Sequence, residues 1–72
     1  MYRYILNKNA QSTGEHEVHN LSLGCKELPQ RDSQLDLGIH VNDRMAVAFA
    51  KNKYPSWHID GCYYCCSSAH RG

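Results

Sequence analysis

The sequence predicts a small α+β fold, with a short antiparallel sheet of about three strands and one main helix. Three observations lead to this prediction: strand-forming residues near the N-terminus, an alternating apolar segment in the middle, and an alanine-containing segment between a capping residue and a proline. The 72 residues leave room for one domain with one core. We therefore expect a single domain over residues 1–72, with an N-terminal strand and loop in residues 1–14 and the core in residues 15–70.

The strand signals lie in the first half of the chain. Residues 2–6 are rich in strand formers, and the polar stretch at residues 7–14 suits a loop or hairpin turn. Residues 15–21 alternate loosely between polar and apolar types and supply a returning strand. The clearest alternation is in residues 35–41, and it predicts a strand with four apolar side chains on one face: Leu35, Leu37, Ile39 and Val41.

Residues 43–53 are predicted to form the main helix. Asn42 is a suitable N-cap, and Asp43 lies in the first turn, near the positive end of the helix dipole. Lysines near the C-terminal end are favourable there, and Pro55 ends the helix. We expect a buried helix face made of three side chains: Ala46, Phe49 and Ala50.

The fold needs a cross-link, either disulfides or a metal site, because the expected free energies of burial and of chain ordering nearly cancel. Burial of about 7,400 Å², about 58 % of it apolar, contributes about 107 kcal/mol. Ordering the whole chain costs about 108 kcal/mol. Four cysteines and five histidines are candidates for disulfides or for a metal site.

Whether the cross-link is a disulfide or a metal ion depends on the cellular compartment. The N-terminal residues contain no apolar run typical of a signal peptide, and no stretch approaches the length of a membrane span. We therefore expect a cytoplasmic protein without membrane contact, in which thiols stay reduced and bind metal. The alternative is a small secreted domain stapled by disulfides.

The strongest chemical signal is the motif Cys62-Tyr-Tyr-Cys65. The Asp60-Gly61 pair predicts a turn that leads into this motif, and a short turn of helix is expected after it. Two residues between two thiolates allow both sulfurs to reach one ion at about 2.3 Å. Such a pair is half of a tetrahedral site, so two further ligands must come from elsewhere in the chain.

His19 and Cys25 are the predicted second ligand pair, one at a strand end and the other in the following turn. Two other histidines remain open as the fourth ligand. His70 can close the site from a C-terminal turn, whereas His16 lies on the opposite face of a regular strand and is the weaker choice. Cys66 is expected to pack as a small apolar side chain.

The full ligand set predicts one structural zinc ion in the core segment, residues 15–70, held by His19, Cys25, Cys62 and Cys65. Three thiolate ligands favour zinc over magnesium or calcium, and iron accepts the same ligands. With four protein ligands the site keeps no open position, so we expect no catalytic residues and no enzyme activity.

A set of landmarks in the same order points to a family. These landmarks are Val18-His19, Cys25, Leu28, Leu37-Gly38, Ala46-Val47, Ala50-Lys51 and Gly61-Cys62-Tyr-Tyr-Cys65. The pattern resembles the metal-binding domain of the Ada DNA-repair methyltransferase and is similar to stand-alone short bacterial proteins of unknown function.

The resemblance implies a bacterial zinc-binding domain, with an Ada-like zinc–thiolate methyl acceptor as an alternative activity. In the Ada domain four cysteines hold zinc, and one of the upstream pair accepts a methyl group from a DNA phosphotriester. Here His19 stands at that position, and imidazole is a poor substitute for a zinc-activated thiolate. The repair activity is therefore not expected to carry over.

The partner class is predicted from charge and from aromatic residues. A net charge of +1 argues against duplex DNA held by charge alone. We expect a monomeric, non-catalytic module for a protein or nucleic acid, without a small-molecule substrate. Its candidate binding residues are Arg44, Lys51, Lys53, Tyr54, Trp57, Tyr63 and Tyr64. In the competing interpretation, Tyr63 and Tyr64 fill space around the cysteine motif and Trp57 completes a thin core.

Overall fold

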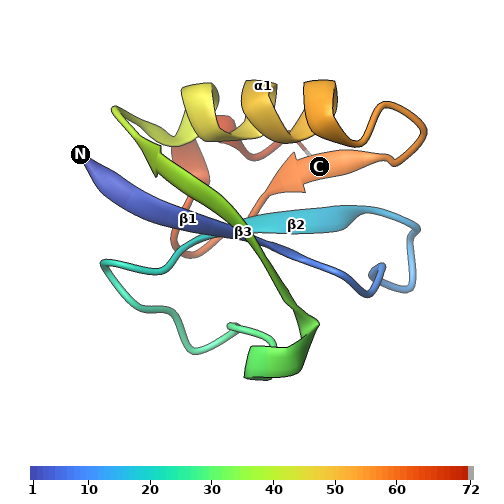
Figure 1. Cartoon of the computed structure of the whole chain (residues 1–72). Coiled ribbons are helices and arrows are strands. Elements are labelled where there is room, and N and C mark those ends of the chain that lie inside the picture. The colour runs from blue at the N-terminus through green and yellow to red at the C-terminus, as the bar shows by residue number, and fades with distance from the viewer. Residues whose placement is uncertain (72) are drawn as a thin grey trace.

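The computed structural model describes residues 1–71 and has one α-helix lying across one face of a four-stranded sheet (Figure 1). The strands are β1 (Tyr2–Asn7), β2 (His16–Asn20), β3 (Gln34–His40) and β4 (Ile59–Gly61), and the helix is α1 (Asp43–Lys53). Two short 3₁₀ helices are η1 (Arg31–Ser33) and η2 (Ser67–Ala69). The predicted small α+β class is confirmed, with one strand more than expected.

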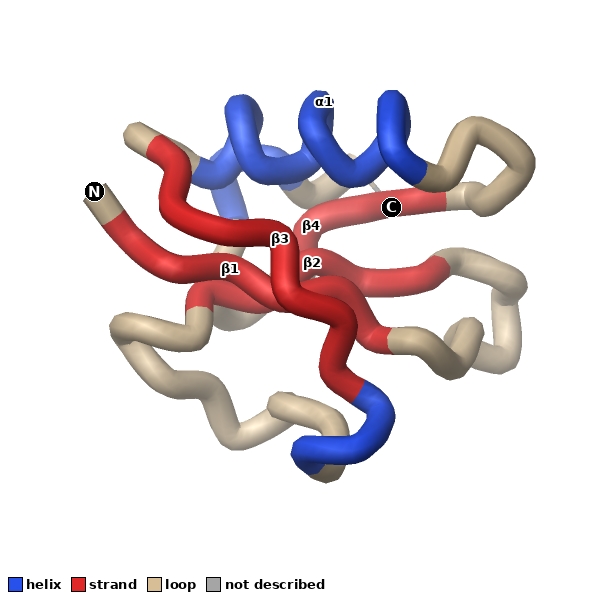
Figure 2. Tube along the Cα trace, in the orientation of Figure 1, coloured by secondary structure: helices blue, strands red, loops and turns tan. Residues whose placement is uncertain are grey.

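The sheet is mixed, in the order β3-β1-β2-β4 (Figure 2). β1 pairs antiparallel with both β2 and β3, whereas β4 pairs parallel with β2. The predicted turn at Asp60-Gly61 is therefore wrong, because both residues belong to β4. Three residues are too few to show an alternating pattern, and the hydrogen bonds that make them a strand come from β2, about forty residues upstream.

The apolar alternation predicted for residues 35–41 is interrupted within β3. Leu37 is buried as expected, but Ile39 and Val41 are more than half exposed. The register against β1 shifts at this point, because Tyr4 pairs with Gly38 while its neighbour Ile5 pairs with Asp36. Gly38 has a φ of 81°, and the extra residue in β3 turns the following side chains to the other face.

The local signals of α1 are confirmed, and one part of its predicted buried face is wrong. The Asn42 side chain accepts a hydrogen bond from the backbone N–H of Met45 (3.0 Å), as an N-cap should. The buried helix residues are Ala46, Val47 and Ala50. Phe49 is 42 % exposed, because its ring packs beside the His40 ring at the β3 margin of the helix rather than under it.

The core lies between the sheet and α1 and extends under the C-terminal segment. Tyr4 is fully buried, and its hydroxyl donates to Asp43 Oδ1 (2.7 Å) at the start of the helix. Cys66 is buried in this core, as predicted for a small apolar side chain. A Cβ on Gly61 would lie 2.9 Å from the Cys66 carbonyl oxygen, so this tight packing requires glycine.

Across residues 1–71, no helix combines the length and the apolar character needed to cross a membrane.

Candidate metal centre

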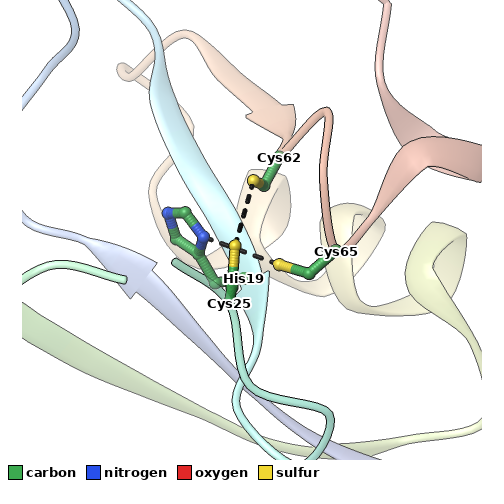
Figure 3. Close-up of side chains that lie close together, drawn as sticks. All are labelled: His19, Cys25, Cys62 and Cys65. Atoms are coloured by element: carbon green, nitrogen blue, oxygen red, sulfur yellow. Dashed lines mark hydrogen bonds between the residues drawn. The ribbon is translucent and has the colours of Figure 1, made fainter. Parts of the chain in front are cut away.

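One histidine and three cysteines converge at one end of the sheet (Figure 3). This cluster, called the His–Cys cluster below, consists of His19, Cys25, Cys62 and Cys65. One ligand atom from each residue lies within 4.8 Å of every other. The arrangement can therefore hold a metal ion, and these are the four residues that the sequence predicts as ligands.

The parallel pairing of β2 and β4 explains why distant segments meet here. His19 is near the C-terminal end of β2, and Cys25 is in the loop that follows. Cys62 directly follows β4, and its backbone N–H donates to the Val18 carbonyl oxygen (2.9 Å). Since parallel strands end at the same edge of a sheet, both ligand pairs are delivered to one place.

Two distances within the cluster agree with the edges of a tetrahedral zinc site. The sulfurs of Cys25 and Cys62 lie 3.8 Å apart, and Cys65 Sγ lies 3.6 Å from His19 Nδ1. Zn–S bonds of about 2.3 Å and a Zn–N bond of about 2.0–2.1 Å give tetrahedral edges of about 3.8 Å and about 3.6 Å. A disulfide needs about 2.05 Å between sulfurs, and all four cysteines are free thiols.

Backbone N–H groups point at the sulfurs of the cluster. The Asn20 N–H donates to Cys65 Sγ (3.3 Å), and the Glu27 N–H donates to Cys25 Sγ (3.5 Å). For Cys62, burial is the largest influence and raises the pKa, while backbone hydrogen bonds from Cys65 and Tyr64 act against it. Hydrogen bonds to sulfur favour the thiolate, which is the form that binds metal.

Burial acts in the opposite direction and keeps the thiols protonated in the absence of a cation. It raises the pKa of Cys62 to about 12 and also raises the pKa of Cys25. The pKa of Cys65 is raised first by its hydrogen bond with the Cys66 side chain and then by burial. The cluster therefore needs a bound cation to hold three thiolates near neutral pH.

His19 is buried in the form that a metal requires. Its side chain has no exposed surface, and burial lowers its pKa, which keeps the imidazole neutral. Within residues 1–71, its Nε2 has no hydrogen-bond partner, and the nearest carboxylate oxygen, Glu17 Oε1, is 3.8 Å away. Leaving a buried ring nitrogen without a hydrogen bond costs about 1–3 kcal/mol of folding free energy. The side chain must therefore stabilise the fold in another way.

The two histidines left open as alternative ligands lie outside the cluster. His16 stacks on Trp57 with ring centroids 3.9 Å apart, and its Nδ1 lies 3.0 Å from the Asn7 carbonyl oxygen. His70 Nδ1 lies 2.9 Å from the Gly61 carbonyl oxygen and 3.3 Å from an oxygen of Asp60.

The candidate aromatic residues fall into two groups. Tyr54 and Trp57 stack on each other and are partly buried at the end of α1. Tyr63 and Tyr64 are 62 % and 57 % exposed, so the interpretation that they fill space around the cysteine motif is wrong. Cys62 and Cys65 point into the cluster, and the two tyrosines between them are left on the surface.

Comparison of the chain with protein-family models, with curated proteins and with solved structures finds no match. The resemblance to the Ada metal-binding domain thus stands on the landmark pattern alone. Of that pattern, the structure shows the close approach of one histidine and three cysteines.

Proposed function

We propose that this protein is a small structural zinc-binding module. His19 Nδ1 and the sulfurs of Cys25, Cys62 and Cys65 hold one zinc ion, which supplies a closed tetrahedral cross-link. The observation that carries this proposal is the agreement of the 3.8 Å and 3.6 Å ligand separations with the edges of a zinc tetrahedron. Iron accepts the same ligands and is a second outcome of the metal analysis below.

The cross-link joins three segments of the chain. It ties the end of β2 to the loop after it and to the loop after β4. Structural zinc in small domains contributes about 10–16 kcal/mol of folding free energy. That is sufficient to stabilise a chain whose burial and entropy terms nearly cancel.

A closed four-ligand site favours a binding role over a catalytic one, because no position is left for substrate or water. We place the protein in the cytoplasm, where its thiols stay reduced, and assign it a protein or nucleic-acid partner as a monomer. An Ada-like methyl acceptor has less support, since the histidine in the acceptor position is fully buried. A disulfide-stapled secreted domain also has less support, because the sulfurs of Cys25 and Cys62 are 3.8 Å apart.

Native mass spectrometry of the reduced protein tests this proposal, with a matched pair of cysteine variants. We expect one zinc per chain in the parent protein and in Cys66→Ala, since Cys66 is buried in the core and is not a member of the cluster. We expect loss of zinc in Cys65→Ala. The cobalt-loaded parent should show a four-coordinate thiolate spectrum without exchangeable water. Equal zinc content in both variants contradicts the ligand assignment.

A further inference from the structure

A basic groove runs between α1 and the C-terminal segment. It has a volume of about 400 Å³, which is within the range of ligand-binding sites. Its apolar floor is formed by Val47, Ile59 and Ala69, and its rim carries the cations Arg44, Lys51 and Arg71. The first two cations come from α1, two helical turns apart, and the third follows η2.

Within residues 1–71, the acidic side chains that line or adjoin the groove, Asp60 and Asp43, are already engaged. Asp60 is buried, and its Oδ1 accepts hydrogen bonds from the N–H groups of Gly61 and Arg71, both at 2.9 Å. Asp43 accepts hydrogen bonds from the hydroxyls of Tyr4 and Ser68. The three rim cations are exposed, so the groove presents a positive surface to solvent.

An aromatic platform continues this surface beyond His70, which lines the groove. The Tyr63 ring meets the His70 ring edge-on at 5.4 Å, and the Tyr64 ring meets Tyr63 in the same way at 5.2 Å. The Lys26 ammonium lies 4.4 Å from the centre of the Tyr64 ring. Cations and exposed rings thus follow one another from α1 to the loop that bears the cysteine motif.

We propose that this surface binds single-stranded nucleic acid, with phosphates in the basic groove and bases stacked on Tyr63 and Tyr64. A positive groove that tracks the backbone, beside exposed rings on which bases stack, is the combination that binds single strands without sequence preference. Two adjacent exposed tyrosines favour this ligand over an acidic peptide, whose carboxylate side chains carry no flat rings to stack. The inference rests on the proposed zinc site, because the two tyrosines lie between two of its ligands.

Fluorescence anisotropy of the zinc-loaded protein with a labelled oligothymidylate of about 12 nucleotides tests the proposal. Three phosphate contacts predict that log K falls with log[salt] with a slope of about −2. Arg44→Gln and Lys51→Gln should each bring the slope closer to zero by about 0.7. The matched control is Arg31→Gln, which should leave slope and affinity unchanged. Arg31 is an exposed cation in η1, and the sheet lies between η1 and α1 (Figure 1).

The aromatic half of the surface has its own test. Tyr63→Leu and Tyr64→Leu should each weaken binding about fivefold or more, without changing the salt slope, because stacking releases no counterions. Zinc content is measured for every variant. This separates loss of the surface from loss of the metal.

Three results overturn the inference. The first is that protein containing one zinc does not bind the oligothymidylate at low salt. This result leaves the zinc proposal intact. Another is equal weakening by Arg31→Gln and Lys51→Gln. The third is competition by poly-glutamate as effective as that by unlabelled oligothymidylate, which assigns the groove to anions in general. Absence of zinc from the folded parent instead contradicts the proposed function itself.

Discussion

At the scale of single residues, the geometry of the site depends most on the buried imidazole of His19. With a metal bound at Nδ1, the ring proton would be on Nε2, whose nearest carboxylate oxygen is Glu17 Oε1, 3.8 Å away and beyond direct hydrogen-bond distance. Histidine ligands of metals usually donate their second ring N–H to a carboxylate or carbonyl, which fixes tautomer and orientation. We therefore expect Glu17, the carboxylate nearest to Nε2, to accept this N–H once a metal is bound; reasoning from the ligand motif alone overlooked it.

Glu17→Gln should weaken zinc binding about tenfold or more, because the orienting carboxylate is lost while the ligands remain. Competition against a chromophoric chelator measures the affinity. Asp32→Asn, a carboxylate change in η1 away from the cluster, is the control and should bind zinc as the parent does. An unchanged affinity in Glu17→Gln shows that the carboxylate does not orient His19.

Zinc affinity should fall steeply as the pH is lowered. The pKa of each cysteine in the cluster is raised, so metal-free protein at pH 7 carries protonated thiols, and binding must displace about three protons. The unbound state gains protons relative to the bound state as acid is added, so acid favours release. Calorimetry in buffers of different ionisation enthalpy counts the protons. Release of one proton or none contradicts a three-thiolate site.

At the scale of elements, the features set by neighbouring residues could be predicted, and those set by distant pairing could not. The helix α1 begins at Asp43, directly after its Asn42 cap, and ends at Lys53, two residues before Pro55, as the local signals indicate. The strand β4 was not predicted from the sequence, because the hydrogen bonds that make it a strand are formed with the distant β2. The bulge in β3 did leave one signal, a glycine inside an alternating segment, which often marks such a bulge.

Gly38→Ala and Gly61→Ala should destabilise the protein for different reasons. At Gly38 the added Cβ meets nothing within 4 Å, so the cost is the positive φ, about 1–2 kcal/mol. At Gly61 the Cβ meets backbone at 2.9 Å and displaces the segment that carries Cys62 and Cys65.

Urea unfolding combined with zinc titration distinguishes the two cases. Gly38→Ala should lower the free energy of unfolding and retain full zinc affinity, whereas Gly61→Ala should lower both. Normal zinc affinity in Gly61→Ala contradicts the view that close packing of β4 against the C-terminal segment positions the two cysteines.

At the scale of the whole molecule, the cluster could be predicted from the sequence and the groove could not. The Cys-x-x-Cys spacing limited the choice of ligands, and so did the need for a cross-link. The fold brings the four predicted ligand residues together. The groove depends on how α1 lies against a C-terminal segment without regular periodicity, so nothing in the sequence indicated that His70 and Arg71 line the same groove as Lys51. The packing of one segment against a distant one is determined by the tertiary structure and leaves no local signal in the sequence.

The accessible surface of the molecule shows how much of its stability burial can provide. It exposes 4681 Å², close to the roughly 4,500 Å² expected for a folded chain of this mass. The apolar core is therefore no larger than its length allows. Under the proposed function, the metal cross-link rather than additional burial supplies the remaining stability.

Far-ultraviolet circular dichroism of the fully reduced protein, first with a strong chelator and then during zinc titration, tests the central claim most directly. The account predicts an unfolded spectrum in chelator and a return of the folded α+β spectrum that is complete at one zinc per chain. A reduced, metal-free protein that keeps its folded spectrum and cooperative unfolding would contradict it.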